Sequence, residues 1–288
     1  MLIRSNFEQE YKYTELYTEA VSGRSLYSYV RSKVRDLAIE VCSINRVIDK
    51  KYGCIQFPYY HHIFADEVTG FERQLKYLKG FGDFITIDQA IEMLNSNLQI
   101  AGRYFCLSFD DGLDCCHKYA LPILAKLQIP ATFYIVTGLV GKLAFPDTHI
   151  TQDVFGYRGI KTSLKFISWA ECRDAINAGV TIGSHTISHT RLSKLNLDEV
   201  NNELVNSKAK IEANTGLPCK HFCAPYGIPG KDFDLIKHGE LAKQNGYSSF
   251  ATGSRGINKP GDSPLALRRD QLLASWSNNQ LKYFFSKP

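Results

Sequence analysis

The chain has 288 residues, of which 44% are hydrophobic, 12% aromatic and 22% charged, a composition that supports a large buried core. This balance excludes intrinsically disordered, collagen-like and coiled-coil chains. The net charge of +5 is mild for this length and predicts no nucleic-acid partner. No apolar run approaches the roughly 18 residues that a membrane-spanning helix needs, so we expect no transmembrane segment.

The first ten residues carry charges of both signs and lack the apolar core that a secretory signal contains. The chain also has eight cysteines, whose spacing does not resemble a zinc knuckle. Cysteines in a chain without a signal peptide are typical of reduced thiols in the cytosol. We therefore expect a cytoplasmic protein in which most cysteines are buried small hydrophobic residues.

Residues 1–53 resemble a separate helical extension, which precedes a main domain over residues 54–288. Between Ser25 and Val41, apolar residues recur at the spacing of one helix face. An isolated helix of this length is only marginally stable, so we expect this face to pack on the main domain. The face consists of Leu26, Tyr29, Val30, Val34, Leu37, Ala38 and Val41. The role of the extension is open between an interaction layer, a lid and a cover for the main domain.

From residue 54 onward, the pattern predicts alternating strands and helices. Strands are expected at 54–57 (ended by Pro58), 104–109, 131–137, 180–182, 221–224 and 247–252. Between them we expect helices: one over 71–81 ended by Gly80 or Gly82, one capped by Asp88, one opened by a Ser168–Glu171 capping box, and two ending near Gly216 and Gly246. This order predicts an α/β fold with a parallel sheet, either open or closed into a barrel. In such barrels the chemistry lies on the loops after the strands.

Polar residues follow two of these strands in patterns that suit catalysis. Asp110 and Asp111 come directly after the 104–109 strand, and adjacent carboxylates repel each other unless a cation or a shared proton separates them. Gly112 then allows a sharp turn; a plain surface turn would explain the same residues. His185 and His189 follow the 180–182 strand, and histidines four apart lie on one face of a helical turn, where both can bind one metal ion.

A third group, residues 222–227, contains Pro225 and Gly227, which fix a turn. This turn could direct the Tyr226 backbone N–H into the same end of the barrel as the two aspartates and the two histidines. An ordinary Pro-Gly turn would explain the same residues. Taken together, one carboxylate and two imidazoles form a set that suits zinc or another divalent ion and leaves positions open for water and substrate. The spare carboxylate then has a role as a base.

At these residues the sequence resembles the polysaccharide deacetylases of carbohydrate esterase family 4, the NodB-homology domain. Residues 108–112 (SFDDG) resemble the family's [T/S]-F-D-D-G motif, and residues 185–189 (HTISH) resemble its H-[S/T]-x-x-H motif. Residues 121–124 and 129–134 resemble the stretch between the two motifs. Tyr60 and His61 resemble the opening strand, and residues 222–227 resemble a variant F-x-x-P-Y-G third motif. The similarity covers roughly residues 54–275.

The resemblance implies a distorted (β/α)-barrel of about seven strands. It implies that Asp110 is the general base and that Asp111, His185 and His189 hold the metal. The Tyr226 N–H would help to stabilise the oxyanion. The metal would be zinc, with cobalt, nickel or manganese as alternatives.

The sequence departs from the best-described members of the family at two places. Those members carry an arginine, which orients the base, where this chain has Cys223, and they carry a late L-x-H motif whose histidine is the acid; no such histidine follows His238. Residues 267–269 instead resemble an L-x-R segment of a broad subgroup, so Arg269 could replace the missing partner of Asp110, or be a surface arginine. His61 or His62 could act as the acid or contact the substrate, and His61 aligns better with the subgroup's Y-H pair; protonated Asp110 is the other candidate acid.

The leading hypothesis from the sequence is a metal-dependent hydrolase that removes an N-acetyl group from an acetamido sugar or glycan intermediate, either lipid-linked or nucleotide-linked. One alternative keeps the metal but changes the substrate to another amide, such as a formyl group or a cyclic ureide. Another is a carbohydrate-binding protein with a decayed site, which the missing arginine and histidine suggest. The oligomeric state cannot be predicted from the sequence.

Overall fold

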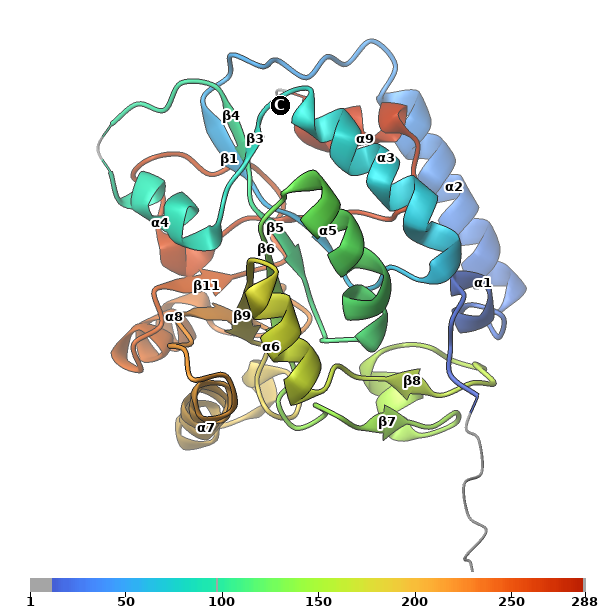
Figure 1. The fold of residues 1–288 in the computed structure, drawn as a ribbon, viewed down its shortest axis with the longest axis vertical. Coiled ribbons are helices and arrows are strands. Elements are labelled where there is room, and N and C mark those ends of the chain that lie inside the picture. Colours follow the sequence, from blue (N-terminus) through green and yellow to red (C-terminus); the bar gives the residue numbers. More distant parts are fainter. Residues whose placement is uncertain (1–11, 97, 287–288) are drawn as a thin grey trace, which may run out of the picture.

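A curved parallel sheet of seven strands forms the centre of the computed structural model, which describes residues 12–96 and 98–286 (Figure 1). The strands are β2 (Pro58–Tyr60), β5 (Leu107–Phe109), β6 (Ala131–Ile135), β9 (Val180–Ser184), β10 (His221–Cys223), β11 (Ser249–Ala251) and β12 (Asp270–Gln271). They lie in the order β11-β10-β9-β6-β5-β2-β12, and each neighbouring pair is parallel. The predicted α/β fold with a parallel barrel-like sheet is therefore confirmed.

The strand register brings the C-terminal ends of the central strands to one edge of the sheet. Phe109 at the end of β5 pairs with Tyr60 of β2 and with Phe133 of β6, and Ser184 at the end of β9 pairs with Phe222 of β10. The residues that follow these strands consequently emerge side by side. This alignment is the basis of the site described below.

A second parallel sheet, β1 (Cys54–Gln56), β4 (Arg103–Phe105) and β3 (Asp83–Phe84), adjoins the first. The single strand predicted over 104–109 was wrong, because the chain leaves this sheet after β4 and enters the large sheet as β5. The Cys106 N–H at the break donates to the Gln56 carbonyl oxygen. Pro58 likewise ends β1 as predicted but begins β2. Both runs pass from the small sheet to the large one, and an apolar run alone cannot show such a transfer.

Helices cover the sheets: α3 (Val68–Lys79), α4 (Ile87–Asn95), α5 (Leu121–Leu127), α6 (Trp169–Asn177), α7 (Leu197–Thr215), α8 (Leu235–Gln244) and α9 (Asn278–Phe285). The Ser168–Glu171 capping box opens α6, and Gly216 ends α7 in a left-handed conformation, as predicted. The cap predicted for α4 was wrong. The Thr86 hydroxyl accepts the Gln89 N–H there, while Asp88 lies in the first turn, near Lys220 and His221.

Shorter elements complete the described chain. These are single-turn segments at Ala65–Glu67, Cys116–Ala120, Ile150–Val154, Leu192–Lys194 and Pro264–Ala266, and the antiparallel pair β7 (Leu143–Ala144) and β8 (Leu164–Lys165). The core between the sheet and the helices is rich in buried aromatic rings, such as Phe71, Phe109, Phe133, Phe222 and Phe250. Seven of the eight cysteines are buried and Cys42 is exposed.

The N-terminal part of the described chain contains α1 (Tyr17–Ala20) and α2 (Leu26–Cys42). The predicted helix is therefore present, but the prediction that its apolar face packs on the main domain was wrong. Leu26, Val34 and Leu37 are 79%, 61% and 64% exposed. The polar side of α2 faces the domain instead, where the Trp276 indole N–H donates to Asp36, and Ser277 and Asn279 donate to Glu40. Helical spacing identifies two faces but not which one a neighbour covers.

The division between residues 53 and 54 stays a prediction, although β1 begins at Cys54. The first ten residues, which lack the features of a secretory signal, lie outside the described part of the chain. Among the described helices, none combines the length and the apolar character needed to cross a bilayer.

Candidate active site

The turn after β5 sends its two carboxylates toward different partners. Asp111 and Gly112 both have positive φ angles, 73° and 74°. A left-handed aspartate is uncommon, and such backbone strain is typical of functional sites. As a result, Asp110 meets Arg269, while Asp111 meets His185 and His189. Each buried charge therefore has its own compensation, which resolves the repulsion expected between adjacent carboxylates.

The two histidines converge without a helix, so the predicted helical turn was wrong. His185 directly follows β9, and the loop then turns back through Thr186 and His189, whose φ angles are 68° and 59°. Left-handed residues cannot continue a right-handed helical turn. The imidazole rings lie 5.0 Å apart, centroid to centroid.

Asp111, His185 and His189 form a group of donors that could hold a divalent ion. The Nε2 atoms of His185 and His189 lie 3.5 Å and 3.2 Å from the same carboxylate oxygen of Asp111. A tetrahedral ion with bonds of about 2.0–2.2 Å separates its ligand atoms by about 3.3–3.6 Å, which is close to these distances. The Nδ1 atom of His189 is buried and has no partner among the described residues. The donor set and spacing thus fit zinc or a similar ion.

The protonation states in this group follow from its burial and its contacts. Burial raises the pKa of Asp111, but the hydrogen bonds with the two histidines lower it by a larger amount. The pKa of this carboxyl therefore lies well below its usual range. Burial lowers the pKa of His185, whereas Cys223 and Asp111 raise it by more. Burial is the main reason for the lowered pKa of His189, which favours the neutral ring that a metal ligand needs. The His185 Nδ1–H donates to the Cys223 carbonyl oxygen at 2.8 Å, which leaves Nε2 to face Asp111.

Asp110 forms a buried, two-pronged ion pair with Arg269. The Arg269 Nη1 and Nη2 atoms donate to Oδ1 and Oδ2 of Asp110, both at 2.8 Å. Arg269 also donates to the Thr252 carbonyl oxygen, and its guanidinium lies 4.2 Å from the centre of the Tyr59 ring. Burial raises the pKa of Asp110, but the Arg269 charge and hydrogen bonds outweigh this, so its pKa lies below the usual value. Arg269 is 2% exposed and is not a surface arginine.

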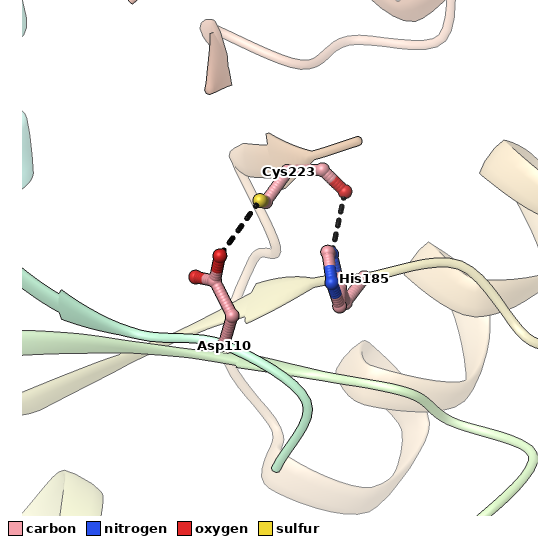
Figure 2. Close-up of side chains that lie close together, drawn as sticks. All are labelled: Asp110, His185 and Cys223. Carbon is pink, nitrogen blue, oxygen red and sulfur yellow. Dashed lines mark hydrogen bonds between the residues drawn. The ribbon is translucent and has the colours of Figure 1, made fainter. Parts of the chain in front are cut away.

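Cys223 touches both members of this ion pair, a contact that sequence reasoning did not assign. Figure 2 shows its thiol directed at Asp110 and its carbonyl oxygen accepting from His185. The Sγ atom lies 3.6 Å from Asp110 Oδ2 and 3.0 Å from Arg269 Nη2. Because burial raises the pKa of this thiol, it remains protonated and can donate to the carboxylate. The sequence did contain a signal for this contact, because Cys223 stands in the third motif where the best-described family members carry the arginine that orients the base.

A cavity of about 330 Å³ is lined by the two carboxylates, the two histidines and Arg269, and Tyr226 and His61 also line it. Tyr226 has a φ of 64°, and its ring packs between His189 and the guanidinium of Arg191. Within the described chain, its backbone N–H makes no hydrogen bond. His61 Nδ1 accepts from Gln271 at 3.1 Å.

Of the two candidate histidines after β2, only His61 reaches this cavity. His62 instead pairs with Glu67 at 2.8 Å and stacks on Tyr17. His61 is therefore the histidine placed to act as the acid or to contact the substrate, and that role stays a prediction.

Glu203 on α7 supports the histidine loop and was not predicted. Its carboxylate accepts the N–H groups of Ile187 and Ser188 and the Ser188 hydroxyl. Glu203 is the seventh residue of α7, and the sequence gave no signal for its role because its partners lie in another loop. This anchor holds the turn between the two histidines in place.

Comparison with known proteins identifies the family of this fold and site. The sequence model of the polysaccharide deacetylase family matches residues 99–249, just over half of the chain. The chain belongs to the polysaccharide deacetylase family. A poly-beta-1,6-N-acetyl-D-glucosamine N-deacetylase from Staphylococcus aureus is 27% identical over 172 residues, which cover 56% of this chain and 53% of that protein. A putative polysaccharide deacetylase, YxkH, from Bacillus subtilis is 25% identical over 139 residues, covering 48% and 42%. The chain thus spans about half the length of these curated relatives.

Solved structures of deacetylases share the fold. IcaB from Ammonifex degensii superposes with a TM-score of 0.65 at 21% identity, covering 82% of this chain and 99% of that one. A Streptococcus pyogenes deacetylase, PplD, in complex with acetate gives a TM-score of 0.63 at 20% identity, covering 84% and 100%. At these identities the likeness supports the fold of this polysaccharide deacetylase family member and no more.

Proposed function

We propose that this family member is a metal-dependent hydrolase that removes an N-acetyl group from an acetamido sugar or glycan intermediate. The observation that carries the proposal is the convergence of Asp110, Asp111, His185 and His189 on one cavity of about 330 Å³. This volume lies at the lower end of the roughly 300–1,000 Å³ that small-molecule pockets usually have. Family membership supports deacetylation as the reaction class.

In this proposal each of the chain's own residues has a defined task. Asp111, His185 and His189 hold a divalent ion, with zinc expected and cobalt, nickel or manganese as alternatives. When bound, such an ion polarises an acyl oxygen and acidifies water. Asp110, kept ionised by Arg269, takes a proton from the attacking water. The Tyr226 N–H donates to the acyl oxygen as negative charge develops on it.

The amine must leave with a proton, and His61 is the proposed donor. Gln271 donates to His61 Nδ1, so the neutral ring carries its proton on Nε2. A neutral ring is too weak an acid for this step, so His61, which lines the cavity, must first take up a second proton on Nδ1. The new N–H then donates to the side-chain oxygen of a rotated Gln271 amide, and the imidazolium gives its Nε2 proton to the departing nitrogen and returns to the neutral ring. Asp110, once protonated by the water, is the alternative donor. The products are acetate and a free amino sugar.

A decayed carbohydrate-binding site is a weaker candidate. It was suggested by the missing arginine at position 223 and by the missing late histidine, but Arg269 pairs with Asp110 from another loop, and His61 and Asp110 are candidate acids. A decayed site would have no reason to retain a buried ion pair at the base together with three converging metal donors. No observation favours hydrolysis of a different amide. The experiment below tests it by including formyl and cyclic amides among the substrates.

The decisive experiment measures acetate release from N-acetylated sugars and glycans by the purified chain, before and after chelation and with added zinc, cobalt, nickel or manganese. We expect turnover to need the ion, and Asp110→Asn to lower it by about 10²–10⁴-fold, since a positioned base contributes that much. Asp110→Asn should still bind the ion, because Asp110 is not among its donors. Undiminished turnover by this variant would remove the proposed base. Activity confined to formyl or cyclic amides in the same panel would redirect the substrate class.

The cytoplasmic site of action also stays a prediction. Fractionation of cells that express the full chain would test it.

A further inference from the structure

Asp232 is a buried acid beside the proposed catalytic cavity, and the reaction proposed above gives it no task. It lies in the loop between β10 and α8 and is 0% exposed. Its Oδ1 atom accepts from the Arg191 guanidinium, and its Oδ2 atom accepts the Ile228 N–H at 3.0 Å. A buried charge is unfavourable unless it is paired and hydrogen-bonded, and Asp232 meets both conditions. Asp232 therefore fixes Arg191 relative to the loop that contains Ile228.

Arg191 in turn contacts the ring of Tyr226. The guanidinium carbon lies 3.6 Å from the centre of this ring, and the His189 ring lies 4.9 Å from it, centroid to centroid. A guanidinium that stacks on an aromatic ring is attracted to its face, and the planar group of arginine suits this contact better than an ammonium does. Because Asp232 sets the direction of the guanidinium, Arg191 can hold the Tyr226 ring in one position against His189.

The backbone of Tyr226 needs such support. Its φ of 64° is a left-handed conformation, which is uncommon for a bulky residue and persists only where the surroundings enforce it. This angle is the rotation about the bond between the Tyr226 nitrogen and its Cα, so a fixed φ and a fixed ring together set the direction of the N–H. The residues that follow are tied as well. The Gly227 carbonyl oxygen accepts the Gly253 N–H at 2.7 Å, and the Ile228 N–H donates to Asp232.

Two further hydrogen bonds join this loop to the loop that contains the histidines. The Ser193 N–H donates to the Asp232 carbonyl oxygen, and the Ser193 hydroxyl donates to the Lys231 carbonyl oxygen, both at 2.8 Å. Together with the Arg191–Asp232 pair, they hold the chain after His189 against the loop over residues 226–232. The position of the Tyr226 N–H relative to the proposed metal donors therefore depends on these contacts.

We propose that Arg191 and Asp232 are positioning residues that direct the Tyr226 N–H at the acyl oxygen of the substrate. The inference rests on the proposed function, in which this N–H stabilises the negative charge that develops on that oxygen. A donor that is held in place before the reaction needs no reorganisation when the charge develops, so its position affects the rate. Neither residue is a proposed metal donor or the proposed base, and their effect reaches the reaction through Tyr226.

Kinetics on the metal-loaded chain provide the first test. Asp232→Asn keeps the shape of the side chain and an acceptor for the Ile228 N–H, but it removes the charge that orients Arg191. We expect kcat and kcat/KM for acetate release to fall together by about 10–100-fold, since loss of a whole oxyanion donor costs about 10²–10³-fold and a misdirected donor keeps part of its effect. KM, and the metal affinity in chelator competition, should change by less than about twofold, because an interaction made only in the transition state contributes to neither.

Asp262→Asn is the matched control for this variant. Asp262 also pairs with an arginine, Arg268, but its side chain is 37% exposed and it does not line the cavity. Its substitution should leave kcat unchanged. A wild-type kcat in Asp232→Asn, or an equal fall in Asp262→Asn, would overturn the proposal.

A double-variant cycle tests whether Arg191 acts through Tyr226. Arg191→Lys keeps a positive charge but loses the planar stacking group, and Tyr226→Ala removes the ring but keeps the backbone N–H. We expect each substitution to lower kcat. The double variant should lose clearly less than the product of the two single losses, because Arg191 then has no ring to hold. Losses that multiply would refute the proposal, since Arg191 would act independently of Tyr226.

A measurement without turnover separates this inference from the proposed function. In protein whose tyrosines alone carry an isotope-labelled amide nitrogen, the NMR signal of Tyr226 is the one that Tyr226→Phe removes. Asp232→Asn should shift or broaden this signal, and Asp262→Asn should leave it in place. An unchanged signal in Asp232→Asn would overturn the inference even if the chain deacetylates sugars. If the wild-type chain releases no acetate, the proposed function fails, and the NMR signal alone decides whether the two residues direct this N–H.

Discussion

The buried ion pair between Asp110 and Arg269 can be tested by removing each charge separately and then both. The substitutions are Asp110→Asn and Arg269→Gln, which keep much of the side-chain volume and polarity. Both side chains are almost fully buried, at 4% and 2% exposure. The charge that remains after a single substitution has little contact with water and no opposite charge at the same place.

The expected magnitude follows from that burial. Breaking a buried ion pair by removing one partner typically costs about 3–5 kcal/mol, because it leaves an uncompensated charge. We therefore expect Arg269→Gln to lower the free energy of unfolding by about this amount at neutral pH. In the double variant no charge is left stranded, so its loss should be smaller than the sum of the two single losses, with a coupling of about 1–3 kcal/mol.

The pH dependence of stability has opposite signs in the two proteins. In the wild-type chain the pKa of Asp110 is lowered, so the pair contributes stability above the unfolded-state pKa, and this contribution falls as the pH drops through the folded-state value. In Arg269→Gln, burial acts on Asp110 without the opposing guanidinium, and burial raises its pKa. The deficit of this variant should therefore be largest at neutral pH and should shrink as the carboxyl becomes protonated.

The assay is urea denaturation followed by circular dichroism and tryptophan fluorescence, in chelator so that ion binding does not contribute. Arg268→Gln is the matched control: this adjacent arginine is 47% exposed and pairs with Asp262, so its loss should cost less than about 1 kcal/mol. The coupling would be refuted if the double variant lost as much free energy of unfolding as the two single variants together, within about 0.5 kcal/mol. An equal loss for Arg268→Gln would show that the effect is not one of burial.

Three further predictions concern the supports of the site and the fold. Glu203→Gln should weaken metal affinity by about 10–100-fold in chelator competition, because Glu203 anchors the loop that holds His189; an unchanged affinity would contradict this supporting role. Adding zinc at about a hundred times its dissociation constant should stabilise the chelated protein by about 2.7 kcal/mol, whereas His189→Ala should abolish this gain in thermal unfolding. Ser168→Ala should lower the free energy of unfolding by about 1 kcal/mol without changing turnover, since it removes the cap of α6; a neutral effect would mean that the Glu171 N–H finds another acceptor.

The meeting of the candidate residues could be predicted because parallel strands impose it. Asp110 and Asp111 follow β5, and His185 follows β9; each position was visible as a polar cluster after an apolar run. The register of a parallel sheet brings such ends together whatever the loops do. The helices were also predictable where local signals defined them, as at the Ser168 cap and at Gly216.

Features that depend on long-range geometry were not predictable. The left-handed backbone at Thr186 has no sequence signal, since a threonine rarely adopts it, so a helical turn was the natural expectation. The break at Cys106 divides the apolar run into β4 and β5, and it depends on which neighbouring strand each of these two strands pairs with. The outward turn of α2 depends on the polar contacts of Asp36 and Glu40 with residues about 240 positions away, and periodicity within one helix contains no such information.

This chain has Cys223 where the best-described family members have an arginine, and the structure indicates that the guanidinium comes from another position instead of being lost. The resemblance to the family implies an arginine near this position to orient the base, and here the guanidinium reaches Asp110 from residue 269, just before β12. The small thiol of Cys223 lies 3.0 Å from Arg269 Nη2, so it leaves the room that the arriving side chain needs. A second guanidinium at position 223 would compete for the same carboxylate and would place two positive charges in one buried space. Positions 223 and 269 therefore constrain each other: Arg269 makes an arginine at 223 unfavourable, and a small residue at 223 makes Arg269 necessary to keep Asp110 ionised.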